Sequence, residues 1–176
     1  MMQKKLPQIK IREWNEKPRT KLRFIKIGDI FCYQFSEEMF VFGQILGKVK
    51  VGHVIQFFDI FQASPTITVE ELSRAQFIGK PIIVDSYTLF DRSPVWSWQI
   101  IAHQADFDPI PFKDLAFKWG DPNGLNFGKV WLDGRTEPKI FSREEVEDLD
   151  WEACVGSIVY NRILEEELAS RGNKGV

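Results

Sequence analysis

The side chains best suited to acid–base or nucleophilic chemistry in this sequence are two histidines and two cysteines. His53 and His103 belong to no HxxxH, HxH or CxxH pattern, and catalytic zinc generally needs three protein ligands, so we predict no metal site. Cys32 and His53 fall on neighbouring predicted strands, where an imidazole could activate a thiol. Because residues from successive strands often meet by chance, we interpret both as structural and predict no catalytic residue.

Motifs that bind phosphates or activate a serine are absent from the sequence. It contains no GxSxG, P-loop or GxGxxG pattern, so we predict no cofactor and no enzymatic activity. The acid pairs Glu37-Glu38 and Glu70-Glu71 occupy a predicted turn and a predicted helix start, where carboxylates are common for structural reasons.

Two tryptophans are candidates for a ligand platform. Trp96 and Trp98 share one face of a predicted strand by the two-residue period. Exposed aromatic rings stack on sugars and bases, whereas rings on an inner strand more often belong to the core. Both interpretations remain open at this stage.

Charge is distributed unevenly along the chain. The formal net charge is −2, which argues against a dedicated nucleic-acid binder. Residues 1–26 nevertheless contain nine Lys or Arg and two acids, and residues 137–152 contain seven acids and two basic residues. The basic end is either a solvated arm or an arm that contacts phosphates. The acidic segment is either a solvated face or a docking surface for a basic partner.

Strand-like segments dominate the first two thirds of the chain. A content of 15 Phe, 6 Trp and 3 Tyr favours a β-rich core. β-branched and aromatic residues cluster in five segments separated by turn residues: Asp29 to Phe35, Phe40 to Leu46, His53 to Phe61, Lys80 to Phe90 and Val95 to Ala102. We expect curvature at Gly28 and Gly43, because glycine in a strand marks a bend or a close approach.

One helix interrupts these strands. The sequence Thr68-Val-Glu-Glu71 is a capping box. The helix that it starts is expected to run to about Phe77 and to end at Gly79.

The segment after His103 has a different character. Asp106 to Trp119 shows no clean period and indicates a long connection, and the turn signal of residues 120–124 follows it. Phe127 to Leu132 and Thr136 to Phe141 predict a second hairpin across Asp133-Gly134. A second capping box at Ser142 predicts a short acidic helix, and apolar residues from Trp151 to Leu168 predict a final amphipathic helix that Gly172 ends.

The sequence therefore predicts an α+β fold with a strongly bent, mainly antiparallel, barrel-like sheet, one inserted helix and a C-terminal hairpin and helix extension. We divide it into a basic arm (1–25) and a single domain (26–176), with a core (26–103) and an extension (104–176). The N-terminus lacks the apolar segment of a signal peptide, and no apolar run is long enough to cross a bilayer. We interpret Cys32 and Cys154 as two buried thiols in a reducing compartment, and a disulfide between them is the alternative. A cytoplasmic protein without membrane contact is therefore expected.

Several of these strings together resemble the immunity protein 26 family. They are KIGDIFCYQF, FVFGQIL, a strand ending in FFDIF, KPIIVDSYTLF and WSWQIIAH. The resemblance covers roughly residues 24–103 and rests on these positions: Gly28, Asp29, Phe31, Phe40, Phe42, Gly43, Ile45, Lys80, Pro81, Ile82, Trp98, Ile100 and Ile101. Residues 104–176 lie outside it, and the first turn carries Ser36-Glu37-Glu38-Met39 where the family often has glycine.

The resemblance implies a bacterial protein that binds and neutralises a cognate toxin without catalysis. A nuclease toxin is typically basic, so an acidic surface suits it as a partner. We nominate two groups of partner-binding acids: Glu144, Glu145, Glu147, Asp148 and Asp150, and then Glu37 and Glu38. The alternatives are a small-molecule or carbohydrate-binding module that uses Trp96 and Trp98, and a protein whose basic arm contacts nucleic acid.

Overall fold

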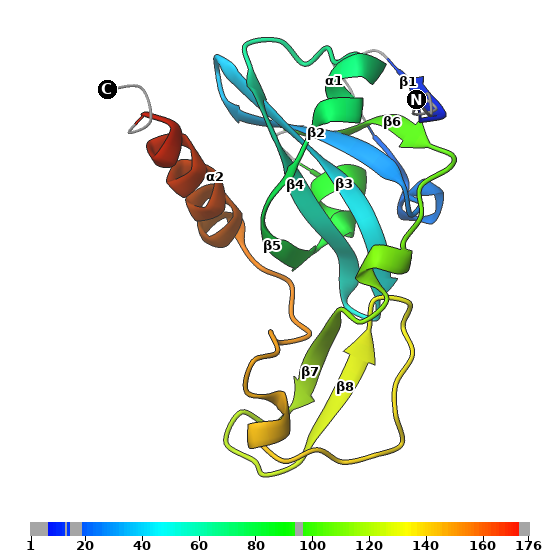
Figure 1. Ribbon diagram of the computed structural model, residues 1–176, viewed down its shortest axis with the longest axis vertical. Coiled ribbons are helices and arrows are strands. Elements are labelled where there is room, and N and C mark those ends of the chain that lie inside the picture. The colour runs from blue at the N-terminus through cyan, green and yellow to red at the C-terminus, as the bar shows by residue number, and fades with distance from the viewer. Residues whose placement is uncertain (1–6, 13, 15–18, 94–96, 173–176) are drawn as a thin grey trace, which may run out of the picture.

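A six-stranded antiparallel sheet forms the body of the protein. The computed structural model describes residues 7–12, 14, 19–93 and 97–172 (Figure 1). The sheet order is β1-β6-β2-β3-β4-β5, and every neighbouring pair is antiparallel. Its strands are β1 (Ile9–Ile11), β2 (Asp29–Ser36), β3 (Met39–Val49), β4 (Gly52–Gln62), β5 (Phe77–Val84) and β6 (Trp98–Gln104).

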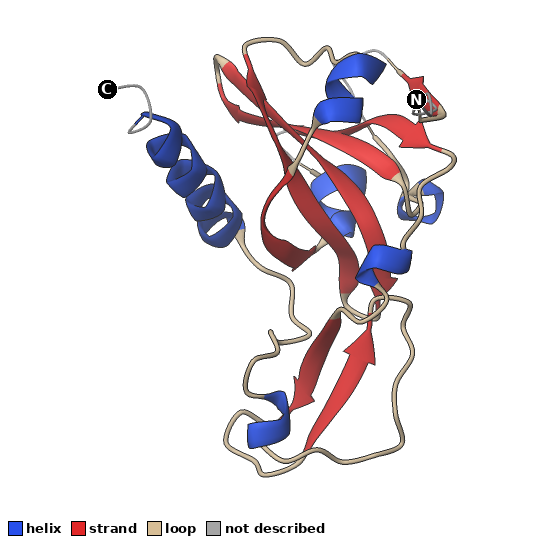
Figure 2. Cartoon of the chain, viewed as in Figure 1, coloured by secondary structure: helices blue, strands red, loops and turns tan. Residues whose placement is uncertain are grey.

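Two helices and a small second sheet complete the fold (Figure 2). The helices are α1 (Val69–Arg74) and α2 (Ser157–Gly172), and the second sheet pairs β7 (Ala116–Gly120) with β8 (Phe127–Trp131). Short helical turns are η1 (Leu22–Phe24), η2 (Tyr87–Asp91), η3 (Ile110–Phe112) and η4 (Glu144–Val146). The predicted α+β class with an antiparallel sheet is confirmed. The term barrel-like is only loosely right, because the sheet is open and β1 and β5 are its edges.

Each face of the main sheet has its own apolar core. On one face Phe31, Phe57 and Trp98 pack against Tyr160 and Leu164 of α2. On the other face the core contains Cys32, Phe42, Phe58 and Leu72, the last from α1. The alternation of these residues along β2, β3 and β4 is the period-two pattern of strands that are buried on both faces.

The close approach expected at Gly43 is present. A Cβ atom at Gly43 would lie 2.4 Å from Cζ of Phe31 and 2.5 Å from the carbonyl oxygen of Gln56. The β3–β4 register shifts between Val41 and Gly43. Only glycine leaves room for the Phe31 ring, which lies over the backbone of β3 at this point. This accounts for the glycine in the middle of a buried strand.

The predicted boundaries around α1 need correction. The Thr68 capping box forms as expected, but the helix ends at Arg74, and Gly79 lies inside β5 with φ +60°. The strand predicted to run to Phe90 ends at Val84. Asp85 then accepts hydrogen bonds from the backbone amides of Tyr87 and Thr88, at 3.1 and 3.2 Å, and these bonds start the turn η2.

The extension pairs differently from the prediction. The end of the segment expected to be an irregular connection forms β7, which is the main partner of β8. The predicted second strand, Thr136 to Phe141, contributes only isolated bridges, Val130 to Thr136 and Phe127 to Phe141. The turn signal at residues 120–124 was correct, but it joins β7 to β8.

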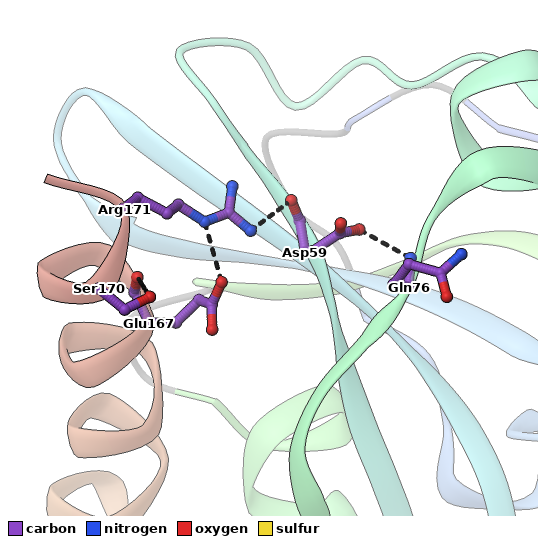
Figure 3. A network of polar contacts seen from close by, with 5 residues as sticks. All are labelled: Asp59, Gln76, Glu167, Ser170 and Arg171. Atoms are coloured by element: carbon purple, nitrogen blue, oxygen red, sulfur yellow. Dashed lines mark hydrogen bonds and ion pairs between the residues drawn. The ribbon is translucent and has the colours of Figure 1, made fainter. Parts of the chain in front are cut away.

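Helix α2 starts later than predicted, and its buried side differs from the predicted stripe. It begins at Ser157 and buries Tyr160 and Leu164, whereas Ile158 is 75% exposed. Figure 3 shows how its last turn is held on the sheet: the Arg171 guanidinium donates to Oε1 of Glu167 at 3.0 Å and to the Asp59 carbonyl of β4 at 2.9 Å.

A third apolar core joins the small sheet to the main one. It combines Leu46, Val54 and Ile83 of the main sheet with Phe117 and Val130 of the small sheet, together with Leu132. The backbone of β3 lies very close to the Leu132 side chain, because a Cβ at Gly47 would lie 2.4 Å from Cγ of Leu132.

Substituting Gly47 tests this junction. Gly47→Ala is expected to lower the free energy of unfolding by about 1–3 kcal/mol, because the new methyl group overlaps Leu132 in a packed core. Gly156→Ala is the matched control, since no atom lies within 4 Å of a Cβ at that position. The measurement is urea unfolding followed by circular dichroism and tryptophan fluorescence. Equal stabilities of the two variants would mean that the extension does not depend on this contact.

Candidate functional site

The structure separates the thiol from the imidazole that could have activated it. Strand β3 lies between β2 and β4, with Cys32 opposite Phe42 and His53 opposite Lys48. Phe42 and Lys48 are six residues apart on β3, which corresponds to roughly 20 Å of strand. The two side chains therefore do not form a nucleophile and base pair.

The two cysteines are free thiols in different surroundings. Cys32 lies in the apolar core, and burial raises the pKa of its thiol. Cys154 was expected to be buried, but it is exposed, and its Sγ donates a hydrogen bond to the Val51 carbonyl at 3.0 Å. A buried thiol with a raised pKa is a poor nucleophile.

The histidines also have structural partners. His53 is buried, with Nδ1 2.9 Å from Oγ of Ser86. Burial, with a smaller contribution from the charge of Lys48, lowers the pKa of His53 to about 4. His103 lies within β6, with Nδ1 2.8 Å from the buried carboxylate of Asp29. No group of three or more potential metal ligands occurs among the described residues.

The ring of Trp98, one of the two tryptophans proposed as a ligand platform, is buried. This residue is 1% exposed and stacks on Tyr33, with ring centroids 4.5 Å apart. The ring of Tyr160 from α2 meets it edge-on at 5.2 Å. Trp96 lies outside the described residues.

The acids nominated between residues 144 and 150 all lie in the extension and are exposed. Two of them form ion pairs within the protein. Glu145 pairs with Lys139 at 2.7 Å and accepts from the Ser142 amide, as the predicted capping box requires. Asp150 pairs with Lys80 of β5 at 2.6 Å and so connects the extension to the main sheet. In place of the predicted acidic helix the segment forms the single turn η4.

Other cations of the extension are also bound internally. Nζ of Lys118 donates to the carbonyl oxygens of Val146 and Glu147. The Arg143 guanidinium donates to the carbonyls of Pro122 and Gly124. Because these basic side chains donate hydrogen bonds to backbone oxygens, they hold the loops of the extension together.

Three of the five nominated acids are exposed and have no ion-pair partner among the described residues. Within the part of the chain that the structure describes, Glu144, Glu147 and Asp148 form no ion pair. Hydrogen bonds from its own backbone amide and from Ser142 lower the pKa of Glu144, so that it stays ionised at neutral pH.

An exposed tryptophan lies in the same extension. Trp119 at the end of β7 is 48% exposed, and its ring covers Gly128, where a Cβ would lie 2.1 Å from Cε2. Trp119 lines a mainly apolar cavity of about 420 Å³, and Pro138 and Ile140 also belong to its lining. Trp119, Ile140, Glu144, Glu147 and Asp148 are all exposed residues of the extension, and we call this set the acidic–aromatic surface.

Sequence reasoning missed Trp119, although a signal was present. Phe117 and Trp119 flank Lys118 in the apolar-polar-apolar alternation of a strand, and a dense turn signal and a second strand follow. The predicted hairpin pairs Phe127–Leu132 with the segment that follows it, Thr136–Phe141, so the residues before Phe127 are left as a connection.

The second nominated patch lies far from the first. Glu37 and Glu38 occupy the tip of the β2–β3 hairpin, directly before β3 begins. The other end of β3 carries Gly47, which contacts the extension. The eleven residues of β3 span roughly 30 Å. Glu37 and Glu38 therefore lie at one end of β3, and the extension that carries the other acids packs near its other end.

Titration of His53 should be visible in the stability of the protein. The folded state keeps His53 neutral down to a pKa of about 4, whereas the unfolded chain takes up the proton near 6.5. Stability should therefore fall as the pH decreases from 6.5 to 4, by on the order of 2–3 kcal/mol for this group. Urea unfolding at pH 7 and pH 4.5 measures the loss, and His53→Gln should reduce it. An identical pH dependence in the variant would contradict the buried neutral imidazole.

Comparison with known proteins identifies the family. The family model of immunity protein 26 matches residues 26–121, from just before β2 to just after β7. Searches of the curated proteins and of the solved structures each return no match. No described helix is both long and apolar enough to cross a membrane. The matched segment covers more than half of the 176 residues, and the protein belongs to the immunity protein 26 family.

Proposed function

We propose that this protein binds a basic bacterial toxin, such as a nuclease, and neutralises it by covering its working surface. Family membership favours an immunity role, which implies a toxin as partner. The observation that supports the location of binding is the acidic–aromatic surface, because the extension presents both an exposed tryptophan and three exposed carboxylates that form no ion pair with a described residue. Interface energy usually concentrates in such an aromatic anchor, and the surrounding charges act on the encounter rate.

The charge arrangement suits an inhibitor of a nucleic-acid-processing enzyme. A groove that binds phosphates is lined by cations, and anions on a rigid surface can occupy it. In this extension the basic residues Lys118 and Arg143 donate to backbone oxygens, so their positive charges are held close to the body. Glu144, Glu147 and Asp148 lie within five residues of one another in sequence and are exposed, and such a concentration of negative charge would attract a basic partner over a Debye length of about 8–10 Å.

A non-catalytic mechanism is part of the proposal. Occlusion needs a stable surface in stoichiometric amounts, without a proton transfer or a nucleophile. The placement of Cys32 and His53 at different ends of the sheet is consistent with this. The carbohydrate-binding alternative loses its support at Trp98, whose ring is buried.

The chain also suggests a division of roles. The family match ends at residue 121, within the turn between β7 and β8. Residues 137–152, which carry the seven acids, lie beyond it. We propose that residues 26–103 act as the scaffold of one domain and that the extension selects the partner.

Charge reversal tests the steering role. The triple variant Glu144→Lys, Glu147→Lys and Asp148→Lys should slow association with the cognate toxin about tenfold or more at low salt, and should flatten the salt dependence of the rate. Stopped-flow or surface plasmon resonance with a purified basic nuclease toxin domain that the protein binds gives the rates. Glu37→Lys with Glu38→Lys is the control at the far end of β3, and a slower rate only in this control would move the binding site to the hairpin.

Removing the aromatic anchor should affect dissociation instead. Trp119→Ala is expected to weaken toxin binding by about 2 kcal/mol or more, mainly through a faster dissociation rate. Trp131→Ala serves as a control, because this half-buried tryptophan lies on the other face of the small sheet. If Trp119→Ala binds and protects like the wild type once folded, the apolar cavity is not the anchor site.

A further inference from the structure

A second concave site, separate from the extension, lies where β1, β6 and β2 run side by side (Figure 1). It is a cavity of about 350 Å³, within the range of small-ligand sites. The side chains that matter in it are those of Lys10, Arg12, Phe24, Lys26, Asp29 and His103. We call it the basic cavity.

Three of its side chains form a row across neighbouring strands. Lys10 of β1 is in register with His103 of β6, and His103 is in register with Asp29 of β2. Residues directly opposite each other in antiparallel strands share a face of the sheet. The row therefore places a lysine, a histidine and a buried carboxylate together on one side.

A bulge in β6 is what turns His103 toward this row. Phe31 pairs with Ile100 and Ile30 with Ala102, so Ile101 is an extra residue in β6. Strict alternation from Trp98 and Ile100 would put His103 on the opposite face. Bulges of this kind commonly re-aim a side chain beside a functional site.

Hydrogen bonds fix how the histidine presents its ring. Asp29 is 4% exposed and accepts from the Lys26 amide at 2.7 Å and from Nδ1 of His103 at 2.8 Å. With Nδ1 donating to the carboxylate, Nε2 is the atom left for a ligand in the cavity. A carboxylate that orients a histidine in this way makes the ring a positioned hydrogen-bonding group.

The cations of the cavity outnumber its anions. Arg19, which also lines it, pairs with Asp91 at 2.7 Å. Lys10, Arg12 and Lys26 form no ion pair with another described residue, and Asp29 is the only acid among the described lining residues. Phe24, which is 55% exposed, supplies an aromatic ring in the lining.

We propose that the basic cavity binds a nucleoside monophosphate, with the phosphate held by Lys10 and Arg12, a ribose hydroxyl donating to Nε2 of His103, and the base stacked on Phe24. Phosphate oxygens are strong acceptors for charge-assisted hydrogen bonds, which arginine and lysine provide. A flat base offers its π-face to an exposed phenylalanine ring. This site is distinct from the acidic–aromatic surface and does not depend on the toxin interaction.

Isothermal titration calorimetry with adenosine 5′-monophosphate on the full chain tests the proposal. Binding should be measurable at low salt, and the double variant Lys10→Ala and Arg12→Ala should weaken it at least tenfold. The variant Lys50→Ala and Lys113→Ala, which removes two exposed lysines elsewhere, should leave the affinity unchanged. His103→Gln should weaken binding about fivefold or more while the melting temperature confirms that the variant is folded.

Three results would overturn this site. The first is no heat of binding, and the second is an equal loss of affinity in both double variants, which would indicate general charge attraction. The third concerns the ligand. If adenosine binds as tightly as the monophosphate, the site does not recognise the phosphate, and if inorganic phosphate binds as tightly as the monophosphate, the site does not recognise the base.

Discussion

The packing of the extension against the end of the β3–β4 hairpin is the contact on which the candidate surface depends. Leu132 lies against Gly47 so closely that no side chain fits between them. Phe117 and Val130, side by side on β7 and β8, are buried in the same core. This burial fixes one face of a two-stranded sheet that would be only marginally stable alone. The rest of the extension is then held rigidly, with its charged and aromatic residues at the surface.

Within the extension, the exposed ion pairs contribute little to stability. Exposed ion pairs such as Lys139 with Glu145 stabilise a protein by about 0–1 kcal/mol. Lys118 and Arg143 donate hydrogen bonds to backbone carbonyls, and Glu144, Glu147 and Asp148 form no ion pair with a described residue. An arrangement of this kind costs little stability, and it produces a field that a basic partner can sense before contact.

Local pattern was enough to predict part of this structure. The β2–β3–β4 meander and the Thr68 capping box follow from apolar alternation, turn residues and side-chain capping, all of which act between near neighbours in sequence. Two features depend on distant contacts. The sequence allowed Phe127–Leu132 to pair with the segment on either side of it, and the core shared with Leu132 accompanies the pairing of β8 with β7. The bulge at Ile101 is visible only when the registers of β2 and β6 are compared. The acids at 144–150 were found from composition, but which of them are free depends on partners such as Lys80.

The central claim is that an immunity protein of this family contacts its toxin through the extension. Hydrogen–deuterium exchange of the protein with and without its toxin tests this most directly, because it locates the contact without altering the chain. We expect slower exchange on binding in β7, β8 and residues 140–151, and unchanged exchange at the β2–β3 hairpin. Protection confined to the hairpin or to the main sheet, with the extension unaffected, would contradict the account.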